Sequence, residues 1–136
     1  MRLPRFNLAD ENGEMLDSSL LEGMRRIVCL IPDLGEDSVR ELCEFDGIYQ
    51  KLMVRNIVML MVIDAEPSEL RTVMDDNGLR LKLLSDTDHV LSGECGAEGR
   101  TTYMVSKEGD IVAEWKDVSV DGHASAVYDR VKLLFK

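Results

Sequence analysis

Three cysteines, Cys29, Cys43 and Cys95, are the side chains of this sequence best suited to redox chemistry. A thiolate is a strong nucleophile and can be oxidised, so an exposed and readily ionised cysteine could carry such a reaction. The three cysteines form neither a Cys-x-x-Cys pair nor a cluster with metal-ligand spacing, and their odd number argues against a disulfide framework. We therefore expect reduced thiols, no metal site and no cofactor.

The sequence around each cysteine separates their roles. Cys29 lies in the apolar run of residues 27–31 and is predicted to be a small buried residue of a strand. Cys43 lies on a predicted helix, nearly opposite its apolar stripe, so its thiol is expected to be accessible. Cys95 lies in a loop-like segment. Any thiol chemistry would use Cys43 or Cys95, and a disulfide between them stays open because the sequence gives no distance.

Ser38 stands at the start of the same predicted helix. Ser38-Val39-Arg40-Glu41 has the S-x-x-E pattern of a capping box, which makes Ser38 the predicted N-cap. Such a cap stabilises a helix by roughly 1 kcal/mol. The alternatives are a retained binding role for the hydroxyl and, with less support, a nucleophilic pair with His89 or His123.

Strand-like and helix-like segments alternate along the chain, and Asn12-Gly13 marks a hairpin. The pattern predicts an α/β fold: a mixed central sheet with helices on both faces and an N-terminal β-hairpin, in one domain spanning residues 1–136. In chain order, the predicted elements are a hairpin of residues 6–8 and 15–16, a strand at 27–31, a helix at 38–52, a strand at 56–64, a helix at 66–77, a strand at 81–84, a short helix at 88–96, a hairpin of 101–105 and 111–115, and a closing helix at 122–136.

Composition excludes several classes of protein. The net charge of −10 argues against binding to nucleic acid or to an anionic membrane surface, since both need a basic surface. No apolar run reaches the ~20 residues of a membrane span, and the basic N-terminus has no apolar stretch behind it, as a signal peptide would. We expect a cytoplasmic protein.

Several segments, in order along the chain, resemble the peroxiredoxins (the AhpC/TSA type), and in particular their bacterioferritin-comigratory or PrxQ-like group. The similarity covers nearly the whole chain, and the order and spacing of the segments are more specific than any one of them. The segments are Leu3-Pro4-x-Phe6-x-Leu8-x-Asp10-x-x-Gly13, Val28-Cys29-Leu30-Ile31-Pro32, Glu41-Leu42-Cys43-Glu44-Phe45 with Tyr49, Leu83-Leu84-Ser85-Asp86-x-Asp88, Arg100-Thr101-Thr102-Tyr103, Lys107-Glu108-Gly109 and Val120-Asp121-Gly122-His123-Ala124.

The resemblance implies a thioredoxin-like fold and an activity that reduces hydroperoxides with a thiolate in a Pro-x-x-x-Thr-x-x-Cys loop. Cys43 matches the resolving cysteine of the PrxQ-like group, and Arg100 matches the arginine that stabilises the thiolate. Ser38 stands at the peroxidatic position, and the expected Thr and Pro-Gly are missing from Leu34-Gly35-Glu36-Asp37. Acidic residues surround the position, and negative charge disfavours a thiolate.

Two functions therefore stay open. One is a peroxiredoxin-like thiol redox protein of antioxidant type, whose peroxide reduction is doubtful and whose residual chemistry would use Cys43 or Cys95, with a thioredoxin-type reductant as partner. The other is a catalytically inactive module that binds a protein, a second copy of itself or, at Arg100, a small anion.

Overall fold

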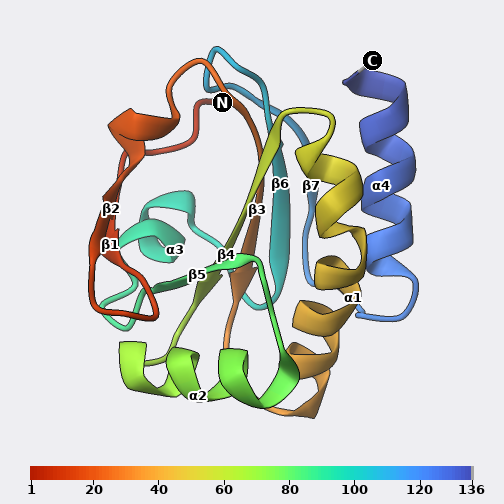
Figure 1. Ribbon diagram of the computed structural model, residues 1–136. Coiled ribbons are helices and arrows are strands. Elements are labelled where there is room, and N and C mark those ends of the chain that lie inside the picture. Colours follow the sequence, from red (N-terminus) through yellow and green to blue (C-terminus); the bar gives the residue numbers. More distant parts are fainter. Residues whose placement is uncertain (136) are drawn as a thin grey trace.

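A computed structural model describes residues 1–135, and its core is a five-stranded sheet (Figure 1). The strand order is β5-β4-β3-β6-β7, in which β3 pairs parallel with β4 and β4 with β5, while β6 and β7 run antiparallel to their neighbours. The strands are β3 (Arg25–Ile31), β4 (Ile57–Ile63), β5 (Lys82–Ser85), β6 (Thr101–Val105) and β7 (Ile111–Trp115). The predicted mixed sheet is confirmed.

Both faces of the sheet are covered (Figure 1). Three helices, α1 (Glu36–Met53), α2 (Pro67–Asn77) and α4 (His123–Leu134), contribute to the core on one face. On the other face lie the hairpin of β1 (Asn7–Ala9) and β2 (Met15–Asp17), the 3-10 helix η1 (Ser18–Leu21) and the short helix α3 (Val90–Cys95). The N-terminal hairpin and the helices on both faces are therefore confirmed.

The central strand β3 explains why its sequence is apolar without alternation. Successive side chains of a strand point to opposite faces, so Ile27, Cys29 and Ile31 enter the core under the three helices. Val28 and Leu30 enter the second core, under the hairpin and α3. Cys29 is fully buried, as predicted.

The helix boundaries follow local signals. Helix α2 begins with a capping box between Glu66 and Glu69 and is followed by its C-cap Gly78, whose φ of 60° is left-handed. Helix α1 begins at Glu36, two residues before the predicted start. The closing helix ends at Leu134, and the last predicted residue, Lys136, lies outside the described part of the chain.

The topology brings three separate segments to one end of the sheet. Strand β3 ends at Ile31, α1 begins five residues later, and Arg100 directly precedes β6, which runs antiparallel to β3.

Within residues 1–135, no helix is long and apolar enough to cross a membrane.

Candidate functional site

Asp33, Ser38, Glu41 and Arg100, here called the Ser38 site, form one hydrogen-bonded chain at this end of the sheet. The Ser38 hydroxyl donates to Asp33 Oδ1 at 2.6 Å and accepts from Arg100 Nη2 at 3.1 Å. Arg100 Nη1 also donates to Glu41 Oε1 at 2.6 Å. The serine hydroxyl thus links a carboxylate to a guanidinium that is already paired with a second carboxylate.

The predicted N-cap role of Ser38 is wrong. The N-cap of α1 is Gly35, without a side-chain cap, so Ser38 lies inside the first turn of the helix. Asp33 organises the preceding loop instead, because its Oδ1 accepts from the Gly35 N–H at 2.9 Å. Glu41 reaches Arg100 rather than the helix backbone, since a buried carboxylate gains more from a charged partner.

Burial and charge set the ionisation of the site. The Ser38 hydroxyl and the Gly35 N–H lower the pKa of Asp33, so this carboxyl stays ionised. Burial raises the pKa of Glu41, against the opposing effect of Arg100. Glu41 is 1% exposed and its Oε2 has no hydrogen-bond partner among residues 1–135. The Arg100 side chain is only 12% exposed, so little of its charge is open to a ligand.

A second buried chain lies behind the site. Thr102 Oγ1 lies 3.5 Å from Cys29 Sγ and 2.8 Å from His123 Nε2. The His123 ring makes edge contacts with the rings of Phe45 and Trp115. Burial and the nearby positive charge of Arg100 lower the pKa of His123 to about 4. His123 is therefore neutral at physiological pH and bonds to Thr102, so the structure gives no support to a Ser38–His123 pair.

The two remaining thiols lie far from an activating environment. Cys43 is exposed, as predicted, with its Sγ 3.8 Å from Asn77 Oδ1. Partial burial, Asp46 and Glu44 raise its pKa. Cys95 is half-buried, and burial raises its pKa despite a hydrogen bond with Tyr103. A low thiol pKa, which reactive cysteines usually need, is absent at both positions.

The structure also argues against the Cys43–Cys95 disulfide that the sequence left open. Cys43 belongs to α1, whereas Cys95 packs against the core on the opposite face of the sheet. A disulfide needs Cα atoms within ~7 Å, and the sheet separates these two elements. All three cysteines are free.

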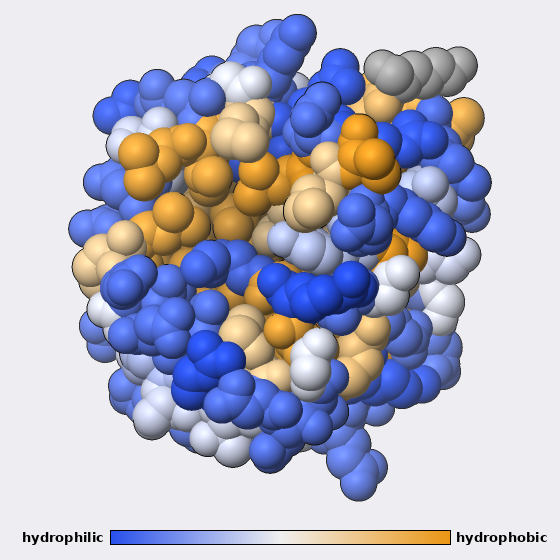
Figure 2. Space-filling view, viewed as in Figure 1, coloured by the Kyte–Doolittle hydropathy of each residue, from blue (hydrophilic) through white to orange (hydrophobic). Residues whose placement is uncertain are grey.

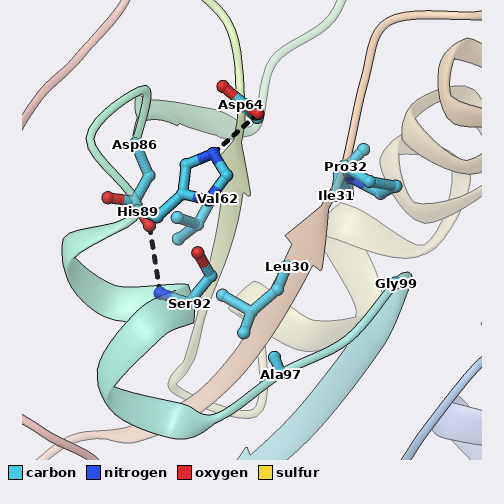
Figure 3. Close-up of a pocket in the computed structure, with 10 residues that line it drawn as sticks. All are labelled: Leu30, Ile31, Pro32, Val62, Asp64, Asp86, His89, Ser92, Ala97 and Gly99. Carbon is cyan, nitrogen blue, oxygen red and sulfur yellow. Dashed lines mark hydrogen bonds and ion pairs between the residues drawn. The ribbon is translucent and has the colours of Figure 1, made fainter.

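A cavity of about 270 Å³ opens beside the Ser38 site, between the ends of β3 and β4 and helix α3 (Figure 3). His89 Nε2 lies 2.9 Å from Asp64 Oδ2 at its rim. The Asp86 carboxylate holds the start of α3 by accepting from the backbone N–H groups of Val90, Leu91 and Ser92. Within residues 1–135, His, Cys, Asp and Glu form no group of three that could hold a metal ion. The cavity is lined by Leu30, Ile31, Pro32, Val62, Asp64, Asp86, His89, Ser92, Ala97 and Gly99.

Comparison with known proteins identifies the class. The model of the AhpC/TSA family matches residues 1–114, and the chain belongs to this family. It is 28% identical to "Putative peroxiredoxin bcp" of Coxiella burnetii over 96% of this chain and 95% of the relative. It is 24% identical to Peroxiredoxin Bcp of Escherichia coli K12, covering 95% of this chain and 83% of the relative.

Solved structures agree on the fold. A structure of Xanthomonas campestris Peroxiredoxin Q superposes with a TM-score of 0.91 at 21% identity, covering 96% of this chain and 92% of that one. The fold is therefore the thioredoxin-like fold of the peroxiredoxins, as the resemblance implied, and the chain is a Bcp/PrxQ-like homologue of thiol peroxidases.

The sequence predicted Ser38 and Arg100 as site residues, but it placed Asp33 and Glu41 only among the acidic residues around position 38, with a capping role for Glu41 in addition. A signal for Asp33 exists in the sequence: an Asp directly after the Pro that ends a strand, two residues before a Gly, is typical of an Asx turn. The partnership of Glu41 with Arg100 joins residues 59 positions apart, and no local pattern reports it.

Proposed function

We propose that this peroxiredoxin-family protein does not reduce peroxide at position 38 and acts instead as a binding module. The observation that carries the proposal is the Ser38 hydroxyl, which is fully buried and held between Asp33 and Arg100. Peroxide reduction in the family, as the resemblance implies, needs a thiolate at this position. A serine hydroxyl does not ionise near neutral pH and cannot form a sulfenic acid.

The charges around Ser38 also support this proposal. Arg100, which would stabilise an anion, is already neutralised by Glu41 at 2.6 Å. Asp33 places a second negative charge 2.6 Å from the Ser38 oxygen. The same contacts weaken the idea of small-anion binding at Arg100, because Nη1 and Nη2 each already donate a hydrogen bond within the site.

The proposed partner is a protein surface, either another protein of the cytoplasm or a second copy of this chain. Figure 2 shows hydrophobic side chains gathered where Figure 1 places β1, β2 and η1. Met15, Leu20 and Met24 of this region are exposed. Exposed apolar groups that cluster on one face are typical of interaction surfaces.

The first test restores the thiol with Ser38→Cys and measures peroxide consumption coupled to a thioredoxin-type reductant, with Escherichia coli Bcp in parallel. We expect no turnover by the wild type. Ser38→Cys should recover no more than roughly a tenth of the Bcp rate, because the Asp33 carboxylate beside this position disfavours the thiolate and Glu41 already pairs with Arg100.

The double variant Asp33→Asn, Ser38→Cys separates charge from loop shape. It should turn over faster than Ser38→Cys, because the carboxylate that opposes the thiolate is gone. Turnover by the wild type would contradict the proposal, and a Ser38→Cys rate equal to that of Bcp would show that the site lost only one sulfur atom.

A residual thiol reaction at Cys43 is the second candidate, and the exposure of its side chain favours it. The raised pKa of Cys43 predicts slow alkylation of the folded protein at pH 7 and a rate that still increases above pH 9. Cys29 should react only after unfolding, because it is fully buried. Mass spectrometry after timed alkylation measures each site, with Cys43→Ser as the control.

The same protein, treated with hydrogen peroxide and a sulfenic-acid trap, distinguishes the two candidates. We expect no adduct at Cys43 or Cys95 at a modest excess of peroxide. A stoichiometric adduct at either cysteine would favour the redox function over the binding module.

A further inference from the structure

A second cavity, of about 350 Å³, lies at the opposite end of the sheet from the Ser38 site. Figure 1 shows the N-terminus and the β6–β7 turn at this end, while α2 lies at the other. Four cationic side chains line it, although the chain has a net charge of −10. We call it the basic cavity, and these side chains are Arg2, Arg5, Arg26 and Lys107.

Arg26 is the unusual member of the cavity. It lies near the start of β3 and is 6% exposed, and its Nε donates to the Met24 carbonyl oxygen at 3.0 Å. Within residues 1–135, no carboxylate pairs with its guanidinium and no hydrogen bond uses its Nη atoms. These Nη atoms are not sealed from solvent, so their donors are open to the cavity. Burying a guanidinium without an anionic partner destabilises the folded protein, because only a paired anion offsets the free energy lost when the charge leaves water.

Arg2 is held beside Arg26 by the backbone. The Leu3 N–H donates to the Gly109 carbonyl oxygen at 3.0 Å, and the Ile111 N–H donates to the Met1 carbonyl oxygen at 2.7 Å. A Cβ on Gly109 would lie 2.9 Å from Arg2 Nη2 and 3.8 Å from Arg26 Nη2. The two guanidinium groups therefore converge over a residue that has no side chain.

Two like charges in this arrangement repel each other. Burial and the neighbouring Arg2 lower the pKa of Arg26, with Glu22 opposing. Arginine nevertheless stays protonated in proteins, so both cations persist at neutral pH. An anion between the two groups would remove this repulsion and use the free donors of both.

The acidic residues around the cavity do not supply that anion. Glu22 lies 4.0 Å from Arg5, and Asp110 lies 3.5 Å from Arg2, in exposed ion pairs that contribute little. Glu108 also lines the cavity but forms no ion pair in the described residues. Arg26 and Lys107 are left without a carboxylate partner within residues 1–135.

We propose that the basic cavity binds a small oxyanion of the phosphate class between Arg2, Arg26 and Lys107, either free phosphate or the terminal phosphate of a phosphomonoester. Guanidinium groups match the oxygens of such an anion through paired N–H donors, and a lysine adds a point charge. The cavity is large enough for a phosphoryl group and part of the molecule that carries it. This site is separate from the Ser38 site and does not depend on the function proposed for it.

The test is a titration of the whole chain with inorganic phosphate at constant ionic strength, followed by amide NMR shifts and by calorimetry. Saturable binding with shifts confined to residues around Arg2, Arg26, Lys107 and Gly109 is expected. Arg2→Gln and Arg26→Gln should each weaken binding about tenfold, as expected for one charge-assisted hydrogen-bonding group. Arg71→Gln, on α2 at the other end of the molecule, removes the same charge and should leave binding unchanged.

A phosphomonoester such as phosphoserine is titrated in parallel. Tighter binding of the ester identifies a phosphorylated molecule as the ligand, and tighter binding of inorganic phosphate identifies the free ion. If Arg26→Gln does not fold, the exposed Arg2→Gln decides together with Lys107→Gln. The proposal is overturned if phosphate produces no more than a chloride titration does, or if Arg71→Gln weakens binding as much as Arg2→Gln.

Discussion

The oxygen of Ser38 stands where a carboxylate and a guanidinium meet, and it serves each of them. It donates to Asp33 and accepts from Arg100, which a thiolate could not do, because a thiolate has no proton to donate. A hydroxyl therefore suits the present set of neighbours better than an ionised sulfur would. The proposed loss of peroxide reduction therefore involves the neighbours of Ser38 as well as the sulfur atom missing at that position.

The ion pair of Arg100 with Glu41 should dominate the stability of the site. Arg100→Gln leaves Glu41, 1% exposed, without its cation, and should lower the free energy of unfolding by about 3 kcal/mol. The double variant Glu41→Gln, Arg100→Gln should be more stable than Arg100→Gln, since no buried charge remains. Urea unfolding of the four proteins in the cycle measures the coupling.

Arg40→Gln is the matched control for this cycle. Arg40 lies on α1, the helix that also carries Glu41, and pairs with Asp121 and Asp37, but all three side chains are largely exposed. Its loss should cost at most about 1 kcal/mol. Equal losses for Arg100→Gln and Arg40→Gln would contradict the importance given to burial.

At this scale the sequence predicted what depends on local periodicity and missed what depends on distant contacts. The burial of Cys29 and the exposure of Cys43 follow from their places on a strand and a helix. The capping box at Ser38 was predicted from a pattern of four residues. The Ser38 hydroxyl instead bonds to Asp33 and Arg100, because buried charge-assisted hydrogen bonds stabilise more than a helix cap does.

At the scale of elements, the strands were predicted nearly to the residue. Strands β6 and β7 begin and end where the pattern placed them, because short apolar runs bounded by turn residues leave few alternatives. The start of α1 was placed two residues late, since Glu36 and Asp37 belong to no apolar stripe. The 3-10 helix η1 was not predicted, as four residues are too few to show a period.

Glycine-to-alanine substitutions at Gly78 and Gly47 should change the free energy of unfolding in opposite directions. Gly78 is the C-cap of α2 at a φ of 60°, and a Cβ there would meet nothing within 4 Å, so Gly78→Ala suffers only from the left-handed backbone. It should lower the free energy of unfolding by about 1 kcal/mol. Gly47 lies within α1, also with open space around it, and Gly47→Ala should raise that free energy by about 0.5–1 kcal/mol.

Chemical denaturation of both variants beside the wild type measures the two effects. The pair is informative because the same methyl group is added at an exposed position in both proteins, once within a helix and once at the left-handed cap that follows one. Changes of the same sign would show that packing or the unfolded state, rather than backbone conformation, governs these positions.

At the scale of the whole molecule, charge is distributed unevenly between the two ends of the sheet. The carboxyl end of β3 leads into a loop rich in acidic residues, whereas its amino end carries Arg25 and Arg26 beside the basic cavity. The net charge of −10 argues against binding to nucleic acid or to an anionic membrane surface, which is an inference about the surface as a whole. A local site can differ from the average, because a cavity brings together residues from the N-terminal segment, β3 and the β6–β7 turn that composition cannot group.

Protonation of His123 should make the packing between α1, α4, β6 and β7 depend on pH. Its ring packs against Phe45 of α1 and Trp115 of β7 and bonds to Thr102 of β6, and its pKa is lowered to about 4. An unfolded histidine has a pKa near 6.5, so below this pH the unfolded state binds the proton more readily than the folded state. The stabilisation is fully present above pH 6.5 and is lost as pH falls from 6.5 to 4.

We therefore expect His123 to account for a loss of about 2 kcal/mol in the free energy of unfolding between pH 7 and pH 5. Burial raises the pKa of Glu41, so this group lowers the stability of the folded protein as pH rises above the ordinary pKa of a glutamate. Its effect is opposite to that of His123. The effect of His123 is therefore measured as the difference between the wild type and a variant without this histidine. Asp33, with a lowered pKa, contributes only at more acid pH. Urea unfolding of wild type and His123→Gln at both pH values gives the difference.

His123→Gln should retain nearly the same stability at pH 7 and pH 5 once the other groups are accounted for, whereas His89→Gln, at an exposed histidine, should lose stability as the wild type does. A wild-type loss that persists in His123→Gln would mean that the buried ring is not the group that titrates. If the loss disappears only in His123→Gln, a single neutral imidazole behind the Ser38 site sets the acid limit of the packing between the sheet and its helices.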